Sequence, residues 1–339
     1  MDTPTCAVRN SSIELLRLLL MFLIVLGHCI IHGLGLYGLS PNSHGIINLI
    51  SNSDLPIVMV IYGFCTCAVD CFVLISGYYK IKLTKKKFLS ILFSLLFYVI
   101  LLNLTPNLIQ HNYSMAIRDI LFISHSPYWF IIDYLFLMIF APLLNFLFER
   151  MSSRYYKILL ITMLLASCYL GFLYNNPINT NGYTLFQFIL MYCIGRYIKL
   201  HNIKIPNSIA IPSYILGAIL CGLLMYAMYH FNLNNYIWRM AYYNNPIVML
   251  NSLMLFYIFL NINIKSQLIN SIAASTLAIY LVQSSNWVST IMYNQIAVWA
   301  KTTPPIYIWL YINILTIGTI AISLLIDKLR TYLGSKVLK

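Results

Sequence analysis

Long apolar stretches separated by short polar or turn-rich segments dominate this sequence. Several of them are about 20 residues long, the length that an α-helix needs to cross the hydrocarbon core of a bilayer. The pattern predicts ten membrane-spanning helices, at residues 13–33, 56–79, 88–105, 128–148, 156–174, 184–200, 209–230, 245–262, 271–299 and 305–327. We therefore predict an all-α fold, a polytopic transmembrane helix bundle that forms a single integral-membrane domain over residues 1–339.

The first apolar stretch and the segment between the third and fourth spans differ from the other predicted elements. The first apolar stretch follows Arg9, as in a signal peptide, but it is about 20 residues long and lacks a small-x-small cleavage site. It also contains Arg17 and His28, so we expect a retained first transmembrane helix. Between the third and fourth spans, Ser114 to Ser124 form a short amphipathic piece that could be an interfacial helix.

The composition agrees with this pattern and excludes a water-soluble protein. Hydrophobic residues make up 60% of the 339 residues, charged residues only 9%, and the mean hydropathy is +0.80. A water-exposed surface needs many more charged side chains than this. The net charge of +13 needs its own explanation, because a basic balance can also indicate a nucleic-acid partner.

The positions of the basic residues indicate membrane orientation instead. Of the 21 Lys and Arg, Arg118, Arg239 and Lys301 lie in loops on one side of the predicted bundle, and Arg17 lies inside a span. All the others lie on the side of both termini, which an even number of spans places together. Since cytoplasmic loops carry an excess of Lys and Arg, we predict a multi-pass protein of the plasma or inner membrane with both termini in the cytoplasm. We predict the lipid bilayer as a partner and no nucleic acid.

Cysteine and histidine positions indicate neither a structural disulfide nor a metal site. All cysteines but one lie inside apolar runs, where a packing thiol is the usual role. Cys65, Cys67 and Cys71 lack the spacing of a zinc finger. His28 and His32 are one helical turn apart and could share an ion, but no third ligand is apparent, so we predict no metal.

Few ionisable residues lie inside the predicted spans, and such residues are functional candidates because a charge in a bilayer is costly. They are Glu14, Arg17, His28, Asp70 and Asp133. Arg17 and His28 are separated by a rotation that returns to within about 20° of the same helix face and by about 16 Å along the helix axis. Alternatively, Arg17 extends to the cytoplasmic headgroups and His28 makes a buried hydrogen bond.

Four short motifs occur in order along the chain. They are Arg17-x10-His28, AVDCFVLISGYY at residues 68–79, SPYWFIIDYLFLMIFAPLLN at residues 126–145 and STLAIYLVQ at residues 275–283. Together they resemble the signature of the acyltransferase 3 family of integral-membrane O-acyltransferases, over nearly the whole chain. One departure is Gln283, because the family often has His at this position. An amide can still orient an acceptor hydroxyl through hydrogen bonds.

The resemblance implies a membrane O-acyltransferase that moves an acyl group, commonly acetyl, from acyl-CoA to a hydroxyl of a cell-surface polysaccharide or its lipid-linked precursor. Acetyl-CoA would be a donor substrate, and no cofactor would be bound permanently. His28 would act as a base toward the acceptor hydroxyl or be acylated itself. The other expected roles are donor binding by Arg17, which is also counted as catalytic, Ser76, Gly77 and Lys80, and acceptor binding by Asp70, Trp129, Asp133 and Gln283.

Other interpretations remain open at this point. A transporter or flippase for a lipid-linked glycan would also need polar residues in the bilayer, but such folds often show inverted repeats, and no repeat is apparent. A non-enzymatic membrane partner or receptor would need larger loops. At single positions, Lys85 to Lys87 fit an anchor to anionic lipids, Asp70 an interhelical hydrogen bond and Trp129 an interfacial aromatic belt.

Overall fold

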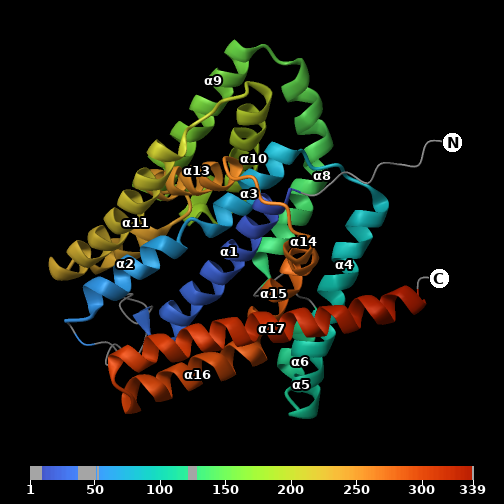
Figure 1. Ribbon diagram of the computed structural model, residues 1–339, viewed down its shortest axis with the longest axis vertical. Coiled ribbons are helices and arrows are strands. Elements are labelled where there is room, and N and C mark those ends of the chain that lie inside the picture. The colour runs from blue at the N-terminus through green and yellow to red at the C-terminus, as the bar shows by residue number, and fades with distance from the viewer. Residues whose placement is uncertain (1–9, 37–50, 52, 121–127, 338–339) are drawn as a thin grey trace.

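The protein is a bundle of α-helices, and every regular element in its described part is helical (Figure 1). The computed structural model describes residues 10–36, 51, 53–120 and 128–337. Within them, eight helical stretches are long and apolar enough to cross a membrane: Ser11–Gly33, Leu55–Tyr79, Lys85–Ile109, Trp129–Arg150, Ser153–Leu173, Asn207–His230, Asn234–Leu260 and Pro305–Tyr332. An α-helix satisfies its backbone hydrogen bonds internally, as a bilayer core requires. The prediction of a polytopic helix bundle is therefore confirmed.

The predicted sixth span, residues 184–200, is shorter than a typical span. Its helix, α10 (Leu185–Leu200), has 16 residues, whereas about 20 are needed to cross the hydrocarbon core. The helix begins only after a turn, where the side chain of Thr184 accepts a hydrogen bond from the backbone N–H of Gln187. This N-cap sets the start of the helix.

The predicted ninth span, residues 271–299, is broken. The segment formed by α14 (Gln267–Ala273) and α15 (Thr276–Gln283) meets α16 (Asn286–Thr302) at an angle of 77°. Ser285 is the N-cap of α16, because its side chain accepts a hydrogen bond from the backbone N–H of Val288. With this bent pair counted as one span, the described part of the chain has nine candidate spans and not the predicted ten.

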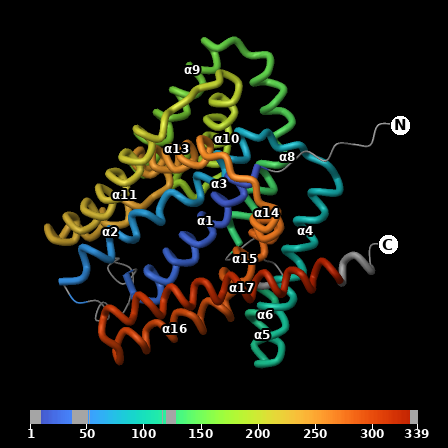
Figure 2. The backbone as a smooth tube through the Cα atoms, viewed as in Figure 1, coloured from blue at the N-terminus to red at the C-terminus, as the bar shows by residue number. Residues whose placement is uncertain are grey.

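The first helix lies at the centre of the bundle. α1 (Ser11–His28) continues into a π-helical turn, η1 (Cys29–Gly33), and it contacts α2 (Leu55–Cys65), α3 (Ala68–Tyr79), α13 (Pro246–Leu260), α14, α15 and α17 (Pro305–Val337). α16 and α17 run side by side across the end of α1 that carries η1 (Figure 2). Helices therefore surround α1, and a polar side chain on it can face a protein interior.

The other elements are α4 (Lys85–Val99), η4 (Ile100–Leu104), α5 (Thr105–Ile109), α6 (Tyr113–Ile120), α8 (Trp129–Arg150), α9 (Ser153–Leu164), η5 (Leu165–Leu173), η6 (Pro177–Gly182), α11 (Asn207–His230), α12 (Asn234–Ile237) and η7 (Trp238–Ala241). The expected interfacial piece, Ser114 to Ser124, begins within α6. Its residues 121–124 lie outside the described part.

α3 and α10 cross with their backbones in close contact. A Cβ atom at Gly77 would meet the backbone carbonyl oxygen of Tyr192, and one at Gly195 would meet that of Leu74. Only glycine permits this approach, which is typical of helix pairs in membranes. The crossing fixes α3, which carries the SGYY motif, against α10.

Candidate active site

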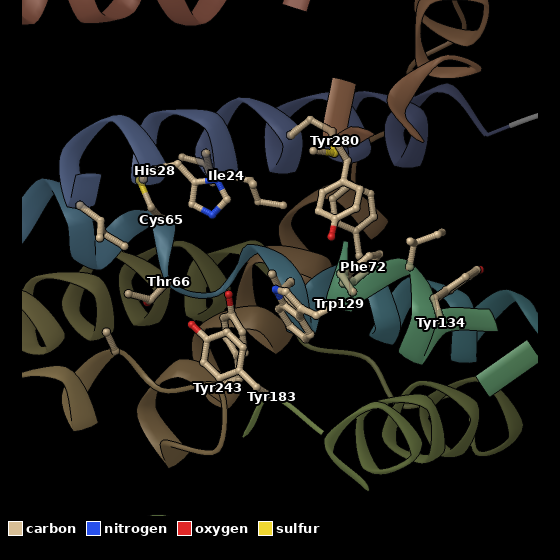
Figure 3. Close-up of a pocket in the computed structure, with 18 of the residues that line it drawn as sticks. Ile24, His28, Cys65, Thr66, Phe72, Trp129, Tyr134, Tyr183, Tyr243 and Tyr280 are labelled. Atoms are coloured by element: carbon tan, nitrogen blue, oxygen red, sulfur yellow. The ribbon is translucent and has the colours of Figure 1, made fainter. Parts of the chain in front are cut away.

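A cavity of about 590 Å³ lies beside α1 in the centre of the bundle (Figure 3). This volume is within the range of roughly 300–1,000 Å³ that is usual for small-molecule sites. Its walls come from α1, η1, α2, α3, α4, α8, η6, η7, α15 and the short segments that carry Tyr183 and Tyr243. Among the described residues that line it, none is Asp or Glu.

Arg17 and His28 both line this cavity, so the structure brings the two residues of the first motif into one space. Eleven residues of α-helix separate them by about 16 Å along the axis, and the cavity therefore follows α1 over that distance. Nη1 of Arg17 lies 3.1 Å from Oε1 of Glu14, and the Arg17 side chain is 34% exposed. Glu14 thus holds the guanidinium from one side, and the guanidinium remains accessible to a ligand in the cavity.

His28 has a hydrogen-bond partner from the far end of the sequence. Its Nδ1 lies 2.8 Å from Oε1 of Gln283, which is only 1% exposed. The amide nitrogen of Gln283 donates to Oγ of Ser284 at 2.6 Å. Gln283, which was expected to bind the acceptor, is not among the residues that line the cavity, and it contacts the His28 imidazole instead.

An aromatic wall faces α1 across the cavity. Trp129, at the start of α8, has its ring centre 4.7 Å from that of Tyr183 and 6.0 Å from that of Tyr243, nearly parallel to the latter at 23°. Figure 3 shows Tyr183 and Tyr243 beside each other on the wall opposite His28. Tyr183 and Tyr243 were not among the residues expected from the sequence, because both lie in turns that no motif marks.

The donor-binding candidates on α3 lie in three different environments. Ser76 lines the cavity, donates to the carbonyl oxygen of Phe72 at 3.0 Å and lies 3.3 Å from the hydroxyl of Tyr134. Gly77 packs against α10, as described above. Lys80 forms an ion pair with Glu149, and Arg196 shares the same carboxylate at 2.8 Å. Of the three, the structure brings only Ser76 to the cavity.

The two carboxylates expected near the acceptor do not line the cavity. Asp70 is 1% exposed, and its two oxygens accept from Nε2 of Gln187 at 3.2 and 3.1 Å. This bond joins α3 to α10, as in the interhelical alternative that the sequence left open. Asp133 is half-buried on α8, one turn after Trp129.

The arrangement suits transfer of a group from a long, charged donor. The Arg17 guanidinium and the His28 imidazole line one cavity, about three helical turns apart on α1. Ile24, Phe72 and Tyr280 also line it (Figure 3). The rings of His28 and His32 are 5.9 Å apart. The described residues contain no group of three or more His, Cys, Asp or Glu side chains placed to hold a metal ion.

Comparison with protein families identifies a match over most of the chain. Residues 10–328 match a family model described as an acyltransferase domain, Acyl_transf_3. No curated protein and no solved structure was found to match the chain. Because the matched region covers nearly the whole chain and contains every helix that lines the cavity, this multi-pass membrane protein belongs to the acyltransferase 3 family.

Proposed function

We propose that the protein transfers an acyl group, most simply acetyl, from acyl-CoA to a hydroxyl of a cell-surface polysaccharide or its lipid-linked precursor. The observation that carries this proposal is the single cavity lined by Arg17 at one end and His28 at the other. The family supports acyl transfer in general. The donor, the acyl group and the acceptor are inferred from the chemistry of the cavity and from the resemblance.

The Arg17 end is the proposed entry for the donor. CoA carries several phosphate charges, and a guanidinium binds phosphate through paired, charge-assisted hydrogen bonds. The Ser76 hydroxyl lines the same space. With the phosphates at Arg17, the extended pantetheine arm passes between the apolar side chains toward His28. Gly77 and Lys80 contribute indirectly, Gly77 by fixing α3 and Lys80 as a positive charge beside the entry.

The His28 end is the proposed place of reaction. His28 takes the proton of the acceptor hydroxyl as the hydroxyl oxygen attacks the thioester carbonyl. The carbon–sulfur bond breaks, and the CoA thiolate leaves with that proton as the free thiol. If His28 is acylated first, its ring nitrogen attacks the thioester carbonyl, the carbon–sulfur bond breaks, and the CoA thiolate leaves as the thiol with a proton from the acylated ring. The acceptor hydroxyl then attacks the acyl carbon, the carbon–nitrogen bond breaks, and the hydroxyl proton returns to the imidazole.

The aromatic wall is the proposed support for the acceptor. The carbon–hydrogen faces of a sugar ring pack against aromatic rings, and Trp129, Tyr183 and Tyr243 offer such faces opposite His28. We expect Trp129→Ala to raise KM for the acceptor about two- to tenfold, because an aromatic contact is worth about 0.5–1.5 kcal/mol. Initial rates at varied acceptor and saturating acetyl-CoA measure this change.

Two controls separate stacking from folding in this prediction. Trp129→Phe keeps an aromatic face and is expected to change KM for the acceptor much less than Trp129→Ala does. KM for acetyl-CoA should stay the same in both variants. An equal rise in KM for donor and acceptor would contradict a role specific to the acceptor.

The basic residues suggest how the cavity is oriented. α3, α8 and α10 end at or next to Lys80, Arg150 and Lys199, and Arg17 is in the part of α1 nearest its N-terminus. By the positive-inside rule we propose that this end faces the cytoplasm, together with both termini. The donor then enters from the cytoplasmic side of the cell membrane, where CoA is found, and His28 lies toward the outer side.

The function is tested with the purified protein in liposomes. The substrates are radiolabelled acetyl-CoA and surface glycan isolated from cells that lack the gene. The expected result is release of free CoA thiol that depends on the glycan, together with alkali-labile acetyl esters on the glycan. Succinyl-CoA in a parallel reaction tests the acyl group. Liposomes that release no thiol with any donor, or glycans that are unchanged in cells without the gene, would overturn the proposal.

A further inference from the structure

We propose that Gln283 is a positioning residue that holds His28 as the tautomer with its proton on Nδ1, so that the unprotonated Nε2 serves the reaction. The proposal rests on the function proposed above, in which His28 is the base. It assigns a task to the late motif that differs from the one expected from the sequence. There, Gln283 was to contact the acceptor, whereas in the structure it contacts the imidazole.

The orientation of the Gln283 amide points to one tautomer of His28. A carbonyl oxygen can only accept a hydrogen bond, and Oε1 of Gln283 lies 2.8 Å from Nδ1 of His28. With the amide in this orientation, Nδ1 carries the proton. The other end of the amide is also occupied, because its nitrogen donates to Ser284 at 2.6 Å. In this orientation, both the oxygen and the nitrogen of the buried amide have hydrogen-bond partners.

The free nitrogen is directed to the cavity. His28 lines the cavity, and its ring projects from α1 toward the wall that carries Thr66 and Tyr243 (Figure 3). Since Nδ1 is bound to Gln283, Nε2 is the atom left for a substrate. The other titratable side chains among the described residues that line the cavity are Arg17, His32, Tyr62, Cys65, Tyr134, Tyr183, Tyr242, Tyr243 and Tyr280.

The pairing of His28 with a neutral amide differs from the arrangement in a catalytic triad. In hydrolases with a Ser-His-Asp triad, a carboxylate accepts the Nδ1 proton and also stabilises the charged imidazolium. No Asp or Glu is among the described residues that line this cavity. The neutral amide of Gln283 sets the direction of the ring and adds no charge. His28 is therefore oriented as a neutral base.

The fold holds Gln283 in place through the break between α15 and α16. The hydroxyl of Tyr128 donates to the carbonyl oxygen of Leu281 at 3.1 Å, before the bend. Nδ2 of Asn103 donates to that hydroxyl at 3.0 Å, and Oδ1 of Asn103 accepts from the backbone N–H of Asn286 at 3.1 Å, after the bend. One buried pair of side chains thus joins both sides of the break, and Gln283 lies between the joined points.

Three substitutions test the kinetic consequence. Gln283→Leu removes the acceptor of the Nδ1 proton and is expected to lower kcat on the order of 10- to 100-fold, by analogy with partners that orient metal-binding imidazoles. KM for acetyl-CoA should not change, since Arg17 is far away. Gln283→His keeps a hydrogen-bonding side chain and should retain more activity. Gln283→Glu supplies a carboxylate that stabilises the imidazolium, so the acid limb of the pH profile of kcat/KM should move to higher pH.

A spectroscopic measurement tests the tautomer without any turnover. Nitrogen NMR of the full-length protein with labelled histidines, compared with the spectrum of His28→Asn, identifies the two ring nitrogens of His28. The proposal requires a protonated Nδ1 and an unprotonated Nε2 in the wild type, and a mixture of both tautomers in Gln283→Leu. A protonated Nε2 in the wild type would overturn it.

The outcomes distinguish this inference from the proposed function. If His28→Ala keeps full activity, the proposed function fails, whatever the NMR spectrum shows. If His28→Ala is inactive and Gln283→Leu has wild-type kcat and an unchanged tautomer, only the positioning role fails. If Gln283→Leu does not fold, the pH profile of Gln283→Glu decides, and an acid limb that does not move would overturn the inference.

Discussion

His28→Ala is expected to lower the rate of acyl transfer by a factor on the order of 10²–10⁴, the usual contribution of a general base. His28 is the imidazole that lines the cavity with Nδ1 already bound to Gln283, so its removal leaves the acceptor hydroxyl without this base. KM for acyl-CoA should change little, because the donor phosphates are placed at Arg17. Release of free CoA thiol by equal amounts of liposome-bound protein measures both constants.

His32→Ala is the matched control for this prediction. His32 lies one helical turn further along, and its ring also lines the cavity. It has no part in the proposed proton transfer, so its removal should cost much less activity than the removal of His28. If His32→Ala is inactive and His28→Ala is active, the base is His32, and our assignment of the base to His28 is wrong.

The bundle was predictable because the bilayer imposes a simple rule on length and polarity. A spanning helix must be about 20 residues long and largely apolar, and Ser11–Gly33 and Trp129–Arg150 meet both conditions in sequence and structure alike. The break between Gln283 and Asn286 could not be predicted from length and polarity. Hydropathy is averaged over a window, and two serines change the average very little, although they end one helix and start another.

The Arg17–His28 pair was predictable from one helix alone. Their spacing fixes their relative direction through the 3.6-residue turn, and the structure places both on one cavity. Gln283 is different, because its contact with His28 joins residues 255 positions apart. No periodicity within a single helix contains that information; it depends on the packing of α15 against α1 and on the bend that follows α15.

The aromatic wall and the two roles of the SGYY motif could not be predicted from the sequence either. Tyr183 follows η6, and Tyr243 lies between η7 and α13, so only the tertiary fold brings both rings to Trp129. Gly77 stands in a motif beside Ser76, yet it faces Tyr192 while Ser76 faces the cavity. Neighbouring residues on a helix point in directions about 100° apart, so the motif serves both packing and the site.

Arg17→Ala is expected to raise KM for acyl-CoA about tenfold to a hundredfold, and to change kcat less. Hydrogen bonds from a charged group contribute about 1.5–3 kcal/mol, and each 1.4 kcal/mol corresponds to about a factor of ten. Arg17→Lys keeps the charge but loses the paired geometry, so its KM should fall between those of the wild type and Arg17→Ala. Initial rates at varied acetyl-CoA measure the three constants.

Glu14→Gln and a salt series complete this test. Glu14 braces the guanidinium at 3.1 Å but carries a charge that repels phosphate, so Glu14→Gln should shift KM for acyl-CoA far less than Arg17→Ala. Added salt screens an exposed charge, and KM of the wild type should therefore rise with ionic strength more steeply than KM of Arg17→Ala. If Arg17→Ala has the KM of the wild type at low salt, the donor phosphates bind elsewhere, and the lysines after α3 become the next residues to replace.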